Sequence, residues 1–101
     1  MQKDMVNRTE VLGIMSGTSL DGIDMADCIL QYHPSSGWDY SIKAAGCYPY
    51  DKRWESYLRN AHKLSSDSLI SLHFEYAVFL AEQINQFISS RSLHPSLLAL
   101  H

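Results

Sequence analysis

The stretch GIMSGTSLDGID, residues Gly13–Asp24, decides the fold, because it joins two apolar runs through a crowd of small polar groups. The run EVLGIM (Glu10–Met15) leads into it, and the run IDMADCILQY (Ile23–Tyr32) leads out of it. In the second run the apolar residues Ile23 and Met25 stand two positions apart, a period that is typical of a strand. We therefore expect two β-strands that are joined by a polar turn.

A third strand is expected after a second turn. HPSSG (His33–Gly37) is a dense turn signal, and Trp38–Tyr48 then alternates apolar with polar side chains. The three strands should form an antiparallel meander, in which Cys28 pairs near Lys43. Cys47 then lies about four residues further along, on the order of 13 Å away, which is too far for a disulfide. We expect both cysteines to be reduced packing residues.

The second half of the chain predicts two helices and a final strand. Asp51 is placed to cap a helix that begins at Lys52, and Ser65 or Ser66 is placed to cap a second helix with an apolar stripe. LLAL (Leu97–Leu100) is typical of a buried parallel strand. The fold class is therefore α/β, in the order β-β-β-α-α-β. It looks interrupted, since a parallel strand normally continues into a crossover helix.

Composition favours one small globular domain and excludes several classes of function. The 101 residues are 46% hydrophobic and 19% charged, and the net charge is −3. Acids and bases are mixed along the chain, so no basic stripe supports nucleic-acid binding. The opening MQKDMVNRTE lacks the apolar segment of a secretion signal, and no apolar run reaches the ~20 residues of a membrane span. We expect a cytoplasmic protein with neither nucleic-acid nor membrane partners.

The polar turn has the composition of an anion site. Gly17 and Gly22 are free to adopt a positive φ and to let another molecule approach the backbone. Successive backbone N–H groups in such a turn form a concave anion-binding nest. The hydroxyls of Ser16, Thr18 and Ser19 add donors for phosphate oxygens. These features predict a turn that binds phosphate.

The two carboxylates of this segment, Asp21 and Asp24, repel a bare phosphate, so they fit only if a divalent cation bridges them. Mg²⁺ prefers one or two carboxylates, several waters and the phosphates of a substrate, and a nucleotide with Mg²⁺ therefore reconciles the composition. The alternative is a structural hairpin whose Asp and Ser side chains cap their own backbone. The string is neither a Walker A motif nor the dinucleotide fingerprint, and spacing alone leaves both interpretations open.

The unbroken string MSGTSLDGID, residues Met15–Asp24, resembles the N-terminal signature of the anhydro-N-acetylmuramic acid kinase family. The likeness extends along the whole chain, but it covers only the start of a family member, since those proteins run several times longer. The family is part of the sugar kinase, actin and Hsp70 superfamily. The resemblance implies that residues 1–101 form the N-terminal part of the first ribonuclease-H-like (actin-like ATPase) lobe of a sugar kinase, with ATP bound between two lobes.

The resemblance also implies an activity. Family members use ATP, Mg²⁺ and water to open the 1,6-anhydro ring of anhydro-N-acetylmuramic acid, which gives N-acetylmuramic acid 6-phosphate in peptidoglycan recycling. The implied phosphate-binding hairpin consists of Gly17, Thr18, Ser19, Leu20, Asp21, Gly22, Ile23 and Asp24. The family's catalytic aspartate lies in a later segment. The base is therefore expected beyond residue 101, and this chain alone is expected to be inactive.

Further expectations concern ligands and partners. Asp21 and Asp24 are candidates to hold Mg²⁺ through water. This expectation rests on the chemistry of carboxylates and not on the resemblance to the family. His101 follows an apolar strand whose end faces the cleft in the superfamily, so it is a candidate for the sugar site. The alternatives to this kinase are a stand-alone interaction module and another sugar kinase or ATPase of the superfamily. A homodimer is left open.

Overall fold

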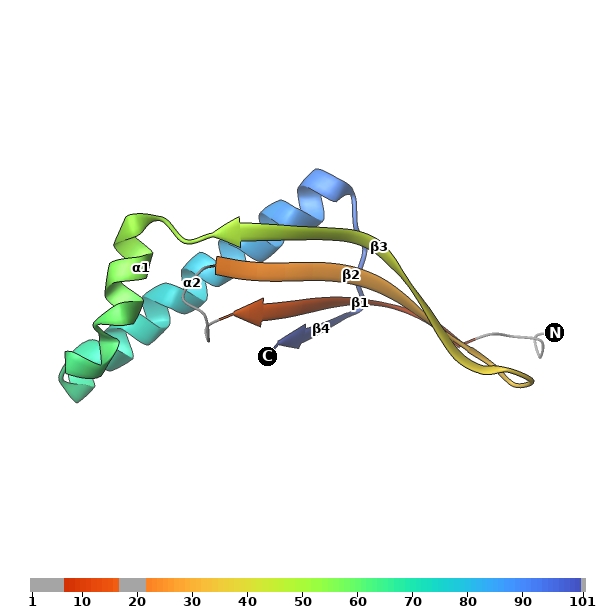
Figure 1. Ribbon diagram of the computed structural model, residues 1–101, viewed down its shortest axis with the longest axis horizontal. Helices are drawn as coiled ribbons and strands as arrows, with labels where there is room; N and C mark the ends of the chain where they lie inside the picture. The colour runs from red at the N-terminus through yellow and green to blue at the C-terminus, as the bar shows by residue number, and fades with distance from the viewer. Residues whose placement is uncertain (1–6, 17–21, 101) are drawn as a thin grey trace.

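The computed structural model describes residues 7–16 and 22–100. Its strands are β1 (Asn7–Ser16), β2 (Gly22–His33), β3 (Gly37–Pro49) and β4 (Leu97–Leu100). Its helices are α1 (Lys52–Arg59), the short 3-10 helix η1 (Ala61–Lys63) and α2 (Ser66–Arg91), and α2 lies across one face of the strands (Figure 1). The order of the elements confirms the expected meander, helix pair and final strand, with η1 as an addition.

The four strands form one mixed sheet in the order β3-β2-β1-β4. β1, β2 and β3 pair antiparallel as a meander, whereas β4 runs parallel to β1. A register shift between Asp27 and Cys28 places Cys28 opposite Ile42, one residue from the expected partner Lys43. Cys28 and Cys47 are not bridged to each other, as expected, but Cys47 is exposed, so the expectation that it is a packing residue is wrong.

The helices begin at capping side chains that the sequence identifies. The Asp51 carboxylate accepts a hydrogen bond from the backbone N–H of Trp54 at 2.9 Å, which caps α1. The hydroxyl of Ser65, the first of the two candidates, accepts one from the N–H of Ser68 at 3.3 Å and caps α2. α2 stops where Ser92 takes a left-handed conformation with a φ of 53°. Local capping chemistry thus sets the boundaries of both helices.

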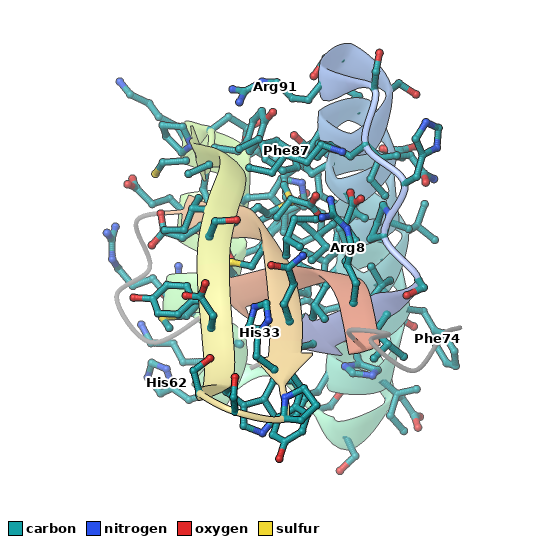
Figure 2. All side chains as sticks on the ribbon, turned by 90° about the vertical axis from the view of Figure 1, so that its right-hand side faces the viewer. Arg8, His33, His62, Phe74, Phe87 and Arg91 are labelled. Carbon is teal, nitrogen blue, oxygen red and sulfur yellow. The ribbon has the colours of Figure 1, made fainter. Side chains whose placement is uncertain are left out.

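The core lies between α2 and one face of the sheet. Phe87 of α2 is 0% exposed and points from the helix toward the strands (Figure 2). Its ring meets Tyr48 edge-to-face with the ring centroids 6.0 Å apart, and Gly46 leaves room beside it. The buried members of this core are Leu12, Ile14, Ile23, Met25, Tyr50, Trp54, Leu80, Phe87 and Leu93. This packing determines which face of β1 and β2 turns away from the helix.

The burial expected for β4 is wrong, although the strand itself is confirmed. All four of its residues are exposed, and Leu100 keeps 64% of its surface accessible. β4 forms the edge of the sheet, and an apolar side chain is buried only where a further layer covers it. The composition of LLAL therefore indicated a strand, but it did not indicate whether a further layer of structure covers that strand.

The molecule is elongated, with extents of 57 × 26 × 20 Å. The tip of the β2–β3 hairpin extends past the end of α2 (Figure 1). There Tyr32 packs on Trp38 with the ring centroids 5.2 Å apart. No helix in the described part of the chain is long and apolar enough to cross a membrane.

Candidate functional site

The predicted phosphate site lies between the end of β1 and the start of β2. Ser16 at the end of β1 pairs with Ile23 near the start of β2, so the two antiparallel strands expected on either side of residues 17–21 are confirmed. Five of the predicted residues, Gly17, Thr18, Ser19, Leu20 and Asp21, lie outside the described residues. The structure therefore places the base of the site, which consists of Ser16, Gly22, Ile23 and Asp24.

Gly22 has a steric role at the base of the turn. It lies opposite Pro49 of β3, and a methyl group on it would overlap the carbonyl oxygen of Tyr48 and come within 2.7 Å of the Pro49 Cα. Gly22 does not use the positive φ that glycine permits, since among the described glycines Gly37 alone has one. Glycine is needed here because β3 closes directly against the base of the turn.

Ile23 and Asp24 point to opposite faces of the sheet, as successive residues in a strand do. Ile23 is fully buried in the core under α2, so only its backbone is left for a ligand. Asp24 is exposed and lies between Met15 of β1 and Cys47 of β3. Of the two carboxylates predicted for Mg²⁺, the one that the structure describes is thus accessible from solvent.

The face that carries Asp24 is hollowed. A cavity of about 660 Å³ opens on it, and its floor is a row of small residues, Ala45, Ala26, Gly13 and Ala99, that pair side by side across all four strands. The full lining is Gly13, Ile14, Met15, Asp24, Met25, Ala26, Cys28, Ala45, Gly46 and Ala99. Asp24 is the charged member of this otherwise apolar lining, so polar chemistry is concentrated at the end next to the turn.

The carboxyl ends of the parallel strands β1 and β4 lie side by side at one end of the sheet. Leu100 pairs in parallel with Ile14, two residues before Ser16. Loops at the carboxyl ends of parallel strands commonly form ligand sites. The predicted sugar residue His101 lies outside the described residues, but the strand that leads to it ends beside the candidate turn.

The predicted metal site is incomplete in the described part of the chain. Within residues 7–16 and 22–100, no group of three or more His, Cys, Asp or Glu side chains is placed to hold a metal ion. Asp24 alone is one carboxylate, which fits the small protein share of a Mg²⁺ site that keeps several waters and binds substrate phosphates.

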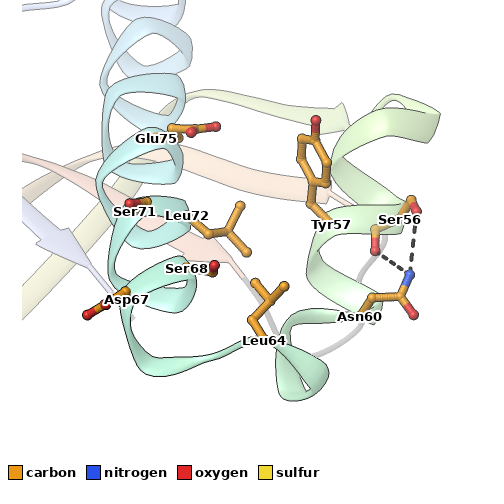
Figure 3. A pocket seen from close by; sticks show the side chains of 9 residues that line it. All are labelled: Ser56, Tyr57, Asn60, Leu64, Asp67, Ser68, Ser71, Leu72 and Glu75. Atoms are coloured by element: carbon orange, nitrogen blue, oxygen red, sulfur yellow. Dashed lines mark hydrogen bonds between the residues drawn. The ribbon is translucent and has the colours of Figure 1, made fainter.

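A second cavity, of about 440 Å³, lies between α1 and the start of α2 (Figure 3). Tyr57 and Leu72 face each other across it, and Asn60 is held by a hydrogen bond of 2.9 Å to the backbone oxygen of Ser56. Its lining is Ser56, Tyr57, Asn60, Leu64, Asp67, Ser68, Ser71, Leu72 and Glu75. None of these residues comes from β1 or β2, so this cavity is separate from the candidate turn.

The sequence reasoning missed one cluster of charged groups beside β1. The Asp27 side chain is 0% exposed, and its neighbours include Glu10 and Lys43. The Nζ of Lys43 lies 3.4 Å from Glu10 Oε1. A signal was present, because Asp27 shares the strand parity of the inward-facing residues Ile23 and Met25.

Comparison with known proteins supports the resemblance. No family model matches the chain. An anhydro-N-acetylmuramic acid kinase from Francisella tularensis subsp. novicida (strain U112) is 34% identical over 88 residues, which cover 82% of this chain. The resemblance to the anhydro-N-acetylmuramic acid kinase family is confirmed. The matched region is 22% of that kinase's length, so the chain spans about a fifth of the curated relative.

Proposed function

We propose that this chain is the N-terminal part of an anhydro-N-acetylmuramic acid kinase, and that residues 17–24 form its first phosphate-binding turn. One observation carries the proposal: MSGTSLDGID occupies a strand–turn–strand junction in a chain that is 34% identical to a kinase of that name. The order of β1 to β4 with α1 and α2 is compatible with the start of a ribonuclease-H-like, actin-like ATPase lobe.

The proposed reaction joins hydrolysis of an internal acetal bridge to phosphoryl transfer. Water attacks the anomeric carbon of the anhydro sugar, and a base outside this chain takes a proton from that water. The bond from the anomeric carbon to O6 breaks, and O6 receives the γ-phosphoryl group of ATP. The products are N-acetylmuramic acid 6-phosphate and ADP. Since ATP is supplied inside the cell, this reaction implies a cytoplasmic location.

This chain would contribute binding and charge stabilisation. In the proposal, backbone N–H groups and hydroxyls of residues 16–19 hold phosphate oxygens, as preorganised donors do in phosphoryl transfer. The exposed carboxylate of Asp24, with Asp21, would hold Mg²⁺ through water. The buried side chain of Ile23 would support the turn from below. The chain supplies no catalytic base in this account, so residues 1–101 alone should be inactive.

The turn is tested by replacing Gly17 with Val in the full-length gene product. A branched side chain there blocks close approach of the phosphates to the backbone, and we expect the affinity for ATP to fall by about tenfold or more. Isothermal titration calorimetry measures it. Gly13→Ala is the matched control, since its added methyl group would meet only the Ala26 oxygen, at 3.7 Å. Unchanged ATP affinity in Gly17→Val would remove the turn from the nucleotide site.

A second candidate function, an interaction module, is favoured by the outer face of α2. Ile70, Phe74 and Val78 are all exposed large apolar residues on that helix, and Phe74 points away from the sheet (Figure 2). Helical spacing of four residues puts them on one face. A homodimer contact or another chain would cover such a stripe. The two candidates differ in whether a reading frame of kinase length continues past residue 101.

A further inference from the structure

Asp27 is a buried acid in the middle of a strand. It lies opposite Leu12 of β1 and Ala44 of β3, on the face that α2 covers. The side chain is 0% exposed, and neither carboxyl oxygen accepts a hydrogen bond from a donor in the described part of the chain. An ionised carboxylate in such a place lacks the donors that burial of a charge requires.

Glu10, next to Asp27, ties three segments together. Its Oε1 faces the Nζ of Lys43 on β3 at 3.4 Å, and its Oε2 accepts the backbone N–H of His94 at 3.0 Å. Its backbone oxygen accepts the N–H of Ser96 at 2.9 Å. His94 and Ser96 belong to the connection between α2 and β4, so Glu10 holds that connection against β1.

Few hydrogen-bond donors lie near the carboxyl groups of Glu10 and Asp27, and these donors bind Glu10. Strand pairing places Glu10 opposite Ile29 and Asp27 opposite Leu12, so the Glu10 and Asp27 side chains are diagonal neighbours on one face of the sheet. Two ionised carboxylates can only accept hydrogen bonds. One of them must therefore carry a proton to bond the other. Glu10 already accepts hydrogen bonds from Lys43 and from the backbone of His94, whereas Asp27 accepts none from the described donors. The proton therefore belongs on Asp27.

We propose that at mildly acidic pH Asp27 keeps its proton in the folded chain, donates it to Glu10, and thereby forms a pH-dependent latch that holds β4 on β1. This proposal does not rest on the proposed kinase function. It assigns a conformational role to a buried acid that the phosphate turn does not use.

The electrostatic surroundings support this assignment. Burial, and then the neighbouring Glu10, raise the pKa of Asp27 to about 6 against a smaller opposing effect of Lys43. The hydrogen bond from Asp27 lowers the pKa of Glu10. From α2, Arg91 is engaged elsewhere, at the backbone oxygen of Ala45, 3.3 Å away. His94 meets Glu10 through its backbone, and its side chain is exposed.

The sign of the pH effect follows from the raised pKa. The folded state holds the proton of Asp27 more tightly than the unfolded chain, so this stabilisation is full below about pH 4 and is lost as the pH rises through about 6. Above that pH, Asp27 is ionised and repels the carboxylate of Glu10, the residue that binds His94 and Ser96. The latch then weakens, and β4 opens more often.

Hydrogen exchange of the full-length gene product tests the latch. The readout is exchange in the peptide that contains Leu97–Leu100, divided by the intrinsic chemical rate. From about pH 5 to about pH 8 we expect it to rise on the order of tenfold or more. Asp27→Asn, which keeps a donor without a charge, should abolish the rise, and Asp39→Asn on exposed β3 should keep it. The same rise in Asp27→Asn as in the wild type overturns the proposal.

A second measurement needs no variant to fold. Carboxyl ¹³C resonances of the wild-type protein report the protonation of Asp27 directly. We expect the Asp27 signal to titrate near pH 6, together with a shift at Glu10. A midpoint at or below about 4, the ordinary value for aspartate, would show that Asp27 is ionised in the fold and would overturn the latch.

Discussion

At the scale of single residues, the surroundings of two glycines explain why the candidate turn is held in place. Gly13 faces the open hollow, where an added Cβ would stand 3.7 Å from the Ala26 oxygen. Gly22 has no such room, because Tyr48 and Pro49 of β3 close against it. A residue type that looks equivalent in the sequence therefore has different functions in the two strands.

The first prediction at this scale compares Gly22→Ala with Gly13→Ala. The methyl group at residue 22 must push β3 away from the base of the turn, so we expect a loss of about 1–3 kcal/mol in the free energy of unfolding, as for other overpacked sites. Gly13→Ala should stay within about 0.5 kcal/mol of the wild type. Urea denaturation of the full-length protein measures both. Equal stability of the two variants would show that β3 is not closed against Gly22.

At the scale of elements, α2 has one face that packs and one that does not. Phe87 is 0% exposed against β3, while Phe74, on the outer face of the same helix, is 67% exposed (Figure 2). The Arg91 guanidinium lies over the Phe87 ring, 5.0 Å from its centroid. The C-terminal half of α2 therefore packs on the sheet through Phe87, while Tyr76 and Phe79 of α2 pack against Trp54 of α1.

The prediction for this element compares Phe87→Ala with Phe74→Ala. Removal of the buried ring should cost about 3–5 kcal/mol through lost burial and the cavity left behind. Removal of the exposed ring should cost no more than about 0.5 kcal/mol. Thermal unfolding of both variants gives the comparison. A large loss in Phe74→Ala would mean that its face is covered, which would favour the interaction role of the α2 stripe.

At the scale of the whole molecule, the sequence predicted what depends on local rules. An apolar run indicated β1, and alternation indicated β2 and β3. Asp51 and Ser65 indicated the helix starts, because periodicity and capping act over a few residues. The exposure of Leu100 was missed, since it depends on whether another layer covers the edge of the sheet. The Asp27–Glu10 contact was also missed, because it joins residues that only the strand register brings together.

In the candidate site, too, some features follow from the local sequence and others depend on distant parts of the fold. The motif predicted that two strands flank the polar segment, and β1 and β2 are observed to pair antiparallel on either side of it. The role of Gly22 could not be read from the motif, because its reason is the path of β3, 26 residues further along at Tyr48. The contacts of residues 17–21 and of His101 lie outside the described residues and stay predictions.

The central claim is that this chain begins an anhydro-N-acetylmuramic acid kinase, and one assay of the full-length gene product tests it most directly. The protein is incubated with ATP, Mg²⁺ and anhydro-N-acetylmuramic acid, and mass spectrometry follows the sugar. The account predicts a product heavier by one water and one phosphoryl group, and none with residues 1–101 alone. If the full-length protein leaves the anhydro sugar unchanged while it phosphorylates an ordinary hexosamine, the claim is contradicted.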